Sequence, residues 1–210
     1  MGIDIRSVTE LIYFKMRRRI NGINIPSTPE FETQISTEYF LERLKACSFY
    51  LEYGSGGSTF QAARMQKQFI SVESDAYFLK ALRSQIEQHI GNHPGKLLHA
   101  NIGLTEDWGK PFFKMPTERR RSRWLKYPTI AWQHIHTPVD LILIDGRFRV
   151  LCALFAVAKC RNSDVEILFD DYVGRPHYHP VEQFLHVSKT IGAMASLRVS
   201  GVLPRRSSVE

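Results

Sequence analysis

A glycine-rich turn that follows a carboxylate is the first candidate for chemistry in this sequence. Glu52 lies two positions before Gly54, and the chain then continues as Ser-Gly-Gly-Ser. Turns of this kind expose backbone amides at the start of a helix and often bind phosphates. A carboxylate in the same place would repel a phosphate, but it would suit a ligand that carries positive charge. The turn therefore predicts a site for a cationic compound, with the following contacts: Glu52, Gly54, Ser55 and Gly56.

The same pattern argues against two common nucleotide sites. A dinucleotide-binding turn needs a third glycine where this chain has Thr59, and a Walker loop needs a Gly-Lys-Ser/Thr sequence that does not follow. S-adenosylmethionine (SAM) meets the charge requirement because it has a sulfonium, an ammonium and no phosphate. A tight turn that binds no ligand remains the simpler alternative.

A second carboxylate supports a nucleoside ligand. Glu73 ends a predicted strand and lies nineteen residues after Gly54. An acid near this spacing accepts hydrogen bonds from both ribose hydroxyls of a bound nucleoside. Acids are common at the ends of strands, so Glu52 and Glu73 carry weight only in combination with the glycine turn.

Three further carboxylates follow two later strands. Asp145 comes directly after an apolar run, and Asp170 and Asp171 come directly after the next one. Neighbouring parallel strands end at the same edge of a sheet, so these groups would repel one another unless a cation or a proton lies among them. Oxygen ligands suit Mg²⁺, which predicts a possible metal site at Asp145, Asp170 and Asp171. The alternatives are a general base or substrate anchor at Asp145, and a simple turn cap at Asp170 or Asp171.

Other side chains near this edge are additional candidates. His177 and His179 form an H-x-H pair in a loop, where His177 could move protons, although surface histidines are commoner. Arg147 and Arg149 could hold an anionic substrate or pair with the neighbouring carboxylates. Trp108 could stack on a base, wall off the acceptor or pack in the core.

The elements that must position these residues alternate along the chain. Strands are predicted at 48–51, 69–72, 96–100, 139–144 and 165–169, and helices at 37–46, 58–66, 75–90 and 148–159. This alternation predicts a parallel sheet with right-handed crossovers, and residues 186–199 could supply two closing strands. The expected fold class is α/β: a Rossmann-like, doubly wound, mostly parallel sheet with helices on both faces and an antiparallel closing strand.

The domain organisation follows from the same pattern. Residues 37–201 are expected to form the main domain, after a helical extension at 1–36 and before a tail at 202–210. An irregular insertion at 103–137 holds all three tryptophans. Connections of this length usually carry function or disorder.

Charge and composition limit the possible partners. The net charge is +7, and residues 114–126 carry six basic residues against one acid. Such a patch could attract nucleic acid, anionic lipid or an acidic substrate, although a solvated loop is the simpler interpretation. No apolar run is long enough to cross a bilayer, and the basic residues 17–19 follow an apolar patch, the reverse of a secretory signal. The three cysteines lack metal spacing, and we expect a cytoplasmic protein.

Four successive segments resemble the motifs of class I SAM-dependent methyltransferases. They are the E-x-G-x-G-G turn at 52–57, "ISVESD", "LLHANIG" and "VDLILIDGR", and the resemblance covers roughly residues 45–200. It implies that Glu52, Gly54 and Gly56 surround the methionine part of SAM, that Glu73 binds the ribose and that Asn101 lies near the adenine. The family often has an acid where Asn101 stands.

The carboxylates after the fourth and fifth predicted strands are similar to those of metal-assisted O-methyltransferases, including the macrocin type. There a divalent ion holds a hydroxyl acceptor and lowers its pKa; this chain has Arg147 where a second acid often stands. The resemblance therefore implies SAM-dependent methylation of a small-molecule hydroxyl, with Asp145, Asp171 and His177 as catalytic candidates and Asp145 also beside the cofactor. The alternatives are an RNA methyltransferase that uses the basic insertion, and a non-catalytic module that binds SAM or a nucleotide.

Overall fold

The computed structural model describes residue 9 and residues 23–161 and 163–199 of the chain. Most of the expected helical extension at 1–36 and the whole tail at 202–210 lie outside the described residues. Within the described part, no helix is both long enough and apolar enough to cross a membrane.

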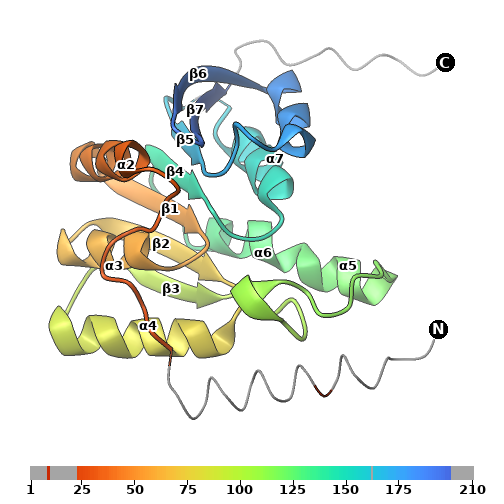
Figure 1. The fold of residues 1–210 in the computed structure, drawn as a ribbon, viewed down its shortest axis with the longest axis horizontal. Helices are drawn as coiled ribbons and strands as arrows, with labels where there is room; N and C mark the ends of the chain where they lie inside the picture. Colours follow the sequence, from red (N-terminus) through yellow and green to blue (C-terminus); the bar gives the residue numbers. More distant parts are fainter. Residues whose placement is uncertain (1–8, 10–22, 162, 200–210) are drawn as a thin grey trace.

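The described strands form one twisted sheet (Figure 1). Its strands are β1 (Phe49–Tyr53), β2 (Gln68–Glu73), β3 (Lys96–His99), β4 (Leu141–Ile144), β5 (Glu166–Phe169), β6 (Leu185–Ile191) and β7 (Met194–Val199). They lie in the order β3-β2-β1-β4-β5-β7-β6, and β1 to β5 are parallel whereas β7 is antiparallel to both neighbours. This arrangement confirms the expected α/β fold class, including the antiparallel closing strand.

Helices cover both faces of this sheet. On one face lie α2 (Gln34–Ala46), α3 (Gly57–Arg64) and α4 (Ala76–His89), and on the other lie α6 (Lys126–Thr129), η2 (Ile130–Gln133) and α7 (Arg149–Lys159). The central strands are therefore buried on both sides, which explains the unbroken apolar run of β4. Two helix starts follow local capping chemistry: the Thr33 side chain accepts from Ser36 N, and the Asp75 side chain accepts from Tyr77 N and Phe78 N.

The segment 103–137 is more ordered than the sequence indicated. After a loop that contains η1 (Asp107–Gly109), it forms α5 (Glu118–Trp124), α6 and η2. Tyr127 and Ala131 are fully buried in the core between the sheet and α7. The second half of the segment is thus the crossover from β3 to β4 and not an excursion from the domain. Helical periodicity is hidden there because α5 buries no residue and α6 contains Pro128.

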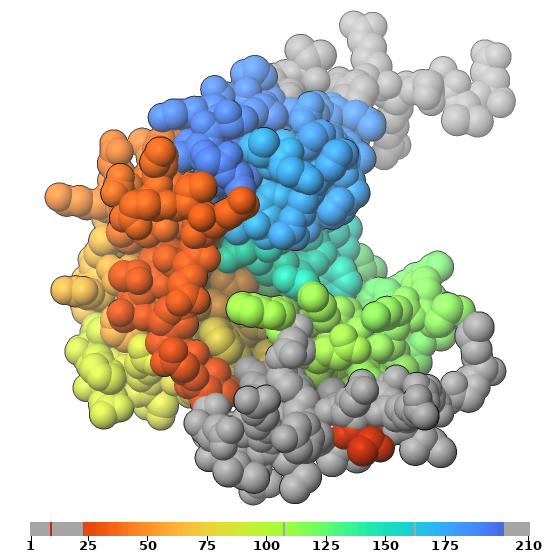
Figure 2. All heavy atoms as spheres, viewed as in Figure 1, coloured from red at the N-terminus to blue at the C-terminus, as the bar shows by residue number. Residues whose placement is uncertain are grey.

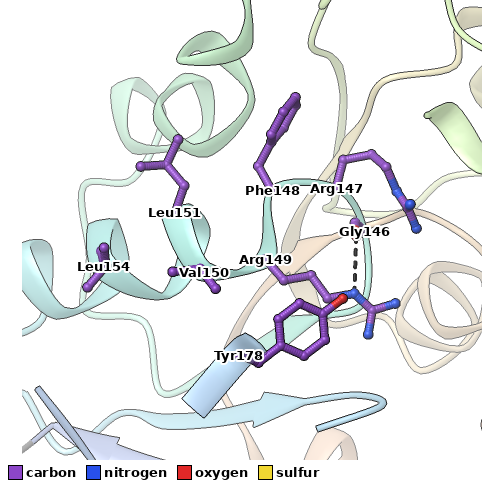
Figure 3. Close-up of a pocket in the computed structure, with 8 residues that line it drawn as sticks. All are labelled: Gly146, Arg147, Phe148, Arg149, Val150, Leu151, Leu154 and Tyr178. Atoms are coloured by element: carbon purple, nitrogen blue, oxygen red, sulfur yellow. Dashed lines mark hydrogen bonds between the residues drawn. The ribbon is translucent and has the colours of Figure 1, made fainter. Parts of the chain in front are cut away.

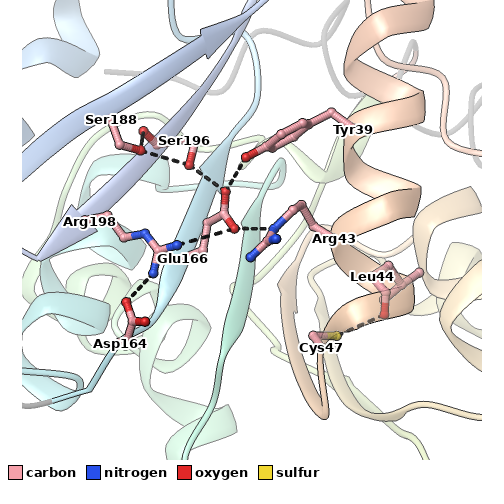
Figure 4. A network of polar contacts seen from close by, with 9 residues as sticks. All are labelled: Tyr39, Arg43, Leu44, Cys47, Asp164, Glu166, Ser188, Ser196 and Arg198. Carbon is pink, nitrogen blue, oxygen red and sulfur yellow. Dashed lines mark hydrogen bonds and ion pairs between the residues drawn. The ribbon is translucent and has the colours of Figure 1, made fainter.

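One buried carboxylate joins the sheet to α2 (Figure 4). Glu166 of β5 is 2% exposed and accepts hydrogen bonds from Tyr39 Oη at 2.8 Å, Arg43 Nε at 2.5 Å and Ser196 Oγ at 2.6 Å. Burial alone would raise the pKa of Glu166, but these hydrogen bonds and the charge of Arg43 lower it below its usual value. Glu166 therefore links three elements as a carboxylate.

Candidate functional site

The main cleft lies at the carboxyl edge of the sheet, where the strand order reverses between β1 and β4. Open α/β sheets bind ligands at this switch point. The cleft has a volume of about 780 Å³. Its walls come from the glycine turn after β1, the ends of β2, β4 and β5, the β3–α5 loop and the N-terminal segment 23–32. Figure 2 shows that segment in orange-red, running down the left part of the view, with the green residues of the β3–α5 loop to its right.

The glycine turn is shaped by close approach of other backbone. Gly54 has a φ of +104°, and a Cβ there would lie 2.6 Å from the backbone nitrogen of Gly146. A Cβ on Gly57 would lie 2.0 Å from the carbonyl oxygen of Thr28 in the N-terminal segment. Gly54, Ser55 and Gly56 all line the cleft. The turn therefore leaves a backbone-lined space for a ligand directly beside the Asp145–Gly146 loop.

The structure corrects the expected position of Glu52. Its side chain is fully buried beneath the turn and does not line the cleft. It accepts hydrogen bonds from Tyr50 at 3.0 Å and Ser71 at 2.6 Å, and also from Ser58 and Thr59. Burial outweighs these hydrogen bonds and raises the pKa of Glu52 to about 7. Glu52 thus organises the turn from below, and the argument that its charge faces the ligand loses its basis.

Glu73 lines the cleft, as the sequence indicated for a ribose contact. Its Oε1 accepts from Ser74 N at 2.6 Å, Asp75 N at 2.7 Å and Ser74 Oγ at 3.1 Å. The hydrogen bonds from described residues all fall on Oε1, so Oε2 keeps its capacity to accept from a ligand. Burial raises the pKa of Glu73, and these hydrogen bonds oppose the change. The loop at Gly109 lies against this carboxylate, because a Cβ there would be 3.1 Å from Oε1.

Asn101 does not contribute to the described cleft. Its side chain is exposed, and its Oδ1 accepts from the backbone N–H of Gly103 at 3.0 Å, which closes a local turn. The cleft beyond Glu73 is formed instead by Asp75, Phe78, Trp108 and Lys110, among others. Trp108 has a φ of +60° and is 80% exposed, so it does not pack in the core. Asp75 and Phe78 could have been expected in the cleft from the sequence, because they follow Glu73 closely in the chain.

The three carboxylates after β4 and β5 converge as expected. One oxygen from each of Asp145, Asp170 and Asp171 lies within 4.8 Å of the others. Burial raises the pKa of Asp145; Arg149 opposes this change and Asp171 adds to it. Burial and both neighbouring carboxylates also raise the pKa of Asp170. The cluster therefore retains protons at a pH where isolated aspartates have lost them.

A guanidinium already occupies the centre of this cluster. Arg149 Nη2 lies 2.8 Å from Asp145 Oδ1 and 3.2 Å from Asp171 Oδ2, and Nη1 lies 4.0 Å from Asp170 Oδ2. The same side chain, 6% exposed, donates to the carbonyl oxygens of Asp145, Gly146 and Asp170. Arg175 Nη2 adds a contact of 2.9 Å to Asp171. The residues do not fit a Mg²⁺ site, because a metal ion would have to displace a buried guanidinium that also donates to three backbone carbonyl oxygens.

His177 lies away from the cleft. It is exposed on η3 (Pro176–Gln183), where its ring contacts Tyr178 with centroids 4.2 Å apart. The expected catalytic position of His177 is therefore corrected, because η3 turns this side chain toward solvent. Tyr178 instead lines a smaller apolar pocket of about 370 Å³ beside the start of α7 (Figure 3).

Comparisons with known proteins agree with this geometry. No protein-family model and no curated protein sequence matches the chain. Among solved structures, a methyltransferase-like protein from Silicibacter pomeroyi has 31% sequence identity and a TM-score of 0.71, with 87% of this chain and 94% of that protein covered.

Two more distant structures share the fold. An O-methyltransferase from Bacillus cereus in complex with SAH has 15% identity and a TM-score of 0.54, covering 95% of this chain and 93% of that one. An SAH-bound methyltransferase from Podospora anserina has 11% identity and a TM-score of 0.50, covering 95% and 90%. The sheet order, the glycine turn at its switch point and the similarity to the Silicibacter protein over nearly its whole length lead to one assignment: the chain belongs to the class I SAM-dependent methyltransferases.

Proposed function

We propose that this protein transfers the methyl group of SAM to a hydroxyl group of a small molecule, with Asp145 as the proton acceptor and without a metal ion. The observation that supports this most is the position of Asp145. Its carboxylate lines the cleft directly beside the glycine turn, its side chain is 36% exposed, and its pKa is raised by burial.

The proposal includes an orientation of SAM in the cleft. Glu73 accepts the ribose hydroxyls through its second oxygen, and the base extends toward Phe78 and Trp108. The methionine end then lies along the turn at Gly54, which lines the cleft and packs closely against the backbone of Gly146. This orientation brings the sulfur toward Asp145, because Gly146 packs against Gly54 and β4 lies on the side of β1 opposite to β2, the strand that ends at Glu73.

Asp145 has the properties of a proton acceptor for an alcohol or phenol. SAM supplies an activated methyl group on a positively charged sulfur. Asp145 takes the hydroxyl proton as the oxygen–carbon bond forms and the carbon–sulfur bond breaks, giving a methyl ether, SAH and a protonated aspartate. Arg149 fixes the carboxylate through Oδ1 at 2.8 Å, which keeps it oriented toward the acceptor.

The substitution Asp145→Asn tests the role of Asp145 as proton acceptor. With labelled SAM and a panel of small alcohols and phenols, Asp145→Asn should lower methyl transfer by roughly 10²- to 10⁴-fold, because the amide cannot accept the proton. SAH binding should persist, since Gly54 and Glu73 are unchanged. Wild-type activity should also persist in a strong chelator. Transfer by Asp145→Asn at the wild-type rate, or loss of wild-type activity in the chelator, would contradict the proposal.

A nucleic-acid acceptor is a second candidate, favoured by one observation. α5 buries no residue, and it presents Arg119, Arg120, Arg121 and Arg123 close to one another. Exposed basic residues can bind phosphates without sequence preference. Label from SAM that enters RNA of a cell extract, and not the small-molecule fraction, would favour this candidate over the first.

A further inference from the structure

We propose that the methyl acceptor is an anion and that Arg147 binds its negatively charged group. This inference rests on the proposed function, because it names the chemical class of the acceptor in the same cleft. Two arginines, Arg147 and Arg149, follow Asp145 closely in the chain, and their environments differ.

Arg149 is not available to a substrate. Its guanidinium is 6% exposed and is held by Asp145, Asp170 and Asp171. In the same part of the cleft, Arg175 is paired with Asp171. These ion pairs use the carboxylates that follow β4 and β5, so those carboxylates already have cationic partners.

Arg147 lacks such a partner among the described residues. Its Nε is buried and has no hydrogen-bond acceptor there, and none of the ion pairs between described residues includes it. A buried N–H group without an acceptor costs free energy comparable to a lost hydrogen bond. A carboxylate or a phosphate would satisfy it, because the planar guanidinium binds such groups through two parallel hydrogen bonds.

The position of Arg147 is fixed by the loop that carries it. The backbone N–H of Arg147 donates to Tyr127 Oη at 3.4 Å, and Tyr127 is fully buried. Phe148 has a φ of +53°, and its ring contacts those of Trp124 and Tyr127. A left-handed backbone at a bulky residue persists only where the surroundings hold it. The loop therefore presents Arg147 in a defined place.

This place adjoins the reacting group. Arg147 lies two residues after Asp145, and both line the main cleft. Figure 3 shows the Arg147 guanidinium directed away from Leu151 and Leu154, the apolar side chains of the smaller pocket. A group bound by Arg147 thus lies on the cleft side, near the proton acceptor. The acceptor that fits is a compact molecule with a hydroxyl and an anionic group close together, such as a hydroxycarboxylic acid.

Matched acceptor pairs test this inference. Hydroxybenzoates and aliphatic hydroxy acids would be compared with the phenols and alcohols that lack only the carboxylate, by transfer of labelled methyl from SAM. We expect at least one acid to exceed its neutral counterpart in kcat/KM. Arg147→Gln should reduce that preference by a factor of about 10–100, because KM for the acids should rise much more than KM for the neutral acceptors. Arg147→Lys should retain part of the preference.

The outcomes separate this inference from the proposed function. Arg161→Gln, at an exposed arginine after α7, is the control for charge alone and should behave as wild type. If the wild-type protein methylates neutral hydroxyls as well as the matched acids, or if Arg147→Gln keeps the preference for acids, the role of Arg147 is overturned while hydroxyl methylation stands. If no hydroxyl compound of either kind is methylated although SAH binds, the proposed function itself fails.

Discussion

At the scale of single residues, carboxylates at three strand ends have different environments. Glu52 lies under the glycine turn among four hydroxyl groups, Glu73 uses one oxygen to hold its own loop, and Asp145 reaches the cleft beside a guanidinium. Residue type alone does not distinguish these roles. Burial and hydrogen-bond partners do, because they determine which carboxylate is protonated and which faces a ligand.

Glu52 gives a prediction for stability as a function of pH. Its pKa is about 7 in the folded protein and about 4.5 as an ordinary glutamate, so its favourable contribution is fully present below pH 4.5 and is lost as the pH rises through 7. Glu52→Gln removes this titration. The free energy of unfolding of the variant, relative to wild type, should rise by on the order of 3 kcal/mol between pH 4.5 and 8.

Denaturant unfolding at a series of pH values measures this difference. Glu42→Gln, at an exposed position of α2, is the control and should show no such rise. A difference between Glu52→Gln and wild type that stays constant with pH would contradict the assigned protonation.

At the scale of elements, Glu166 gives the opposite dependence on pH. Its pKa is lowered in the folded protein, so its contribution is present above the unfolded pKa and is lost as the pH falls through the folded value. Glu166→Gln should reduce the free energy of unfolding by about 1–3 kcal/mol at pH 7, and the reduction should shrink below about pH 4. Asp164→Asn, at the 95% exposed end of the same network, should change stability by less than about 1 kcal/mol. Equal losses in both variants would contradict the importance of the buried carboxylate.

The sequence predicts most of the helices and strands, but it does not predict features that depend on contacts between residues far apart in the chain. The alternating apolar and amphipathic segments predict β1 to β5, α3, α4 and α7, because strands buried on both faces form short apolar runs and the helices that cover them have one apolar face. The inward turn of Glu52 was not predictable, since its hydroxyl partners come from α3, β1 and β2. The exposure of His177 depends on the path of η3, and the central place of Arg149 among the carboxylates depends on how β4 and β5 pair.

At the scale of the whole molecule, the N-terminal segment 23–32 completes the cleft. Gln61 Nε2 donates to Ser27 O at 2.6 Å, Gln85 Nε2 donates to Ile25 O at 3.1 Å, and Ile25 is buried in the core. This contact could not be predicted, because no local pattern in the sequence connects the segment to the glycine turn. The cleft therefore depends on a part of the chain that precedes the methyltransferase motifs.

Two neighbouring glycines test this dependence. A Cβ on Gly57 would lie 2.0 Å from Thr28 O, whereas a Cβ on Gly56 has no atom within 4 Å. Gly57→Ala should therefore lower the free energy of unfolding of the ligand-free protein by about 1–3 kcal/mol, because the segment must move away. Gly56→Ala, the matched control, should have little effect on this quantity. Chemical denaturation of both variants measures it, and equal stability of the two would contradict the packing of the segment on the turn.

The binding of SAH to the wild-type protein and to Glu73→Ala, measured by titration calorimetry, tests the central claim most directly. We expect one SAH per wild-type chain. The variant should bind about 100-fold more weakly or not at all, because it loses the carboxylate that accepts the ribose hydroxyls. A wild-type protein that does not bind SAH, or a variant that binds it with unchanged affinity, would contradict this account of the cleft.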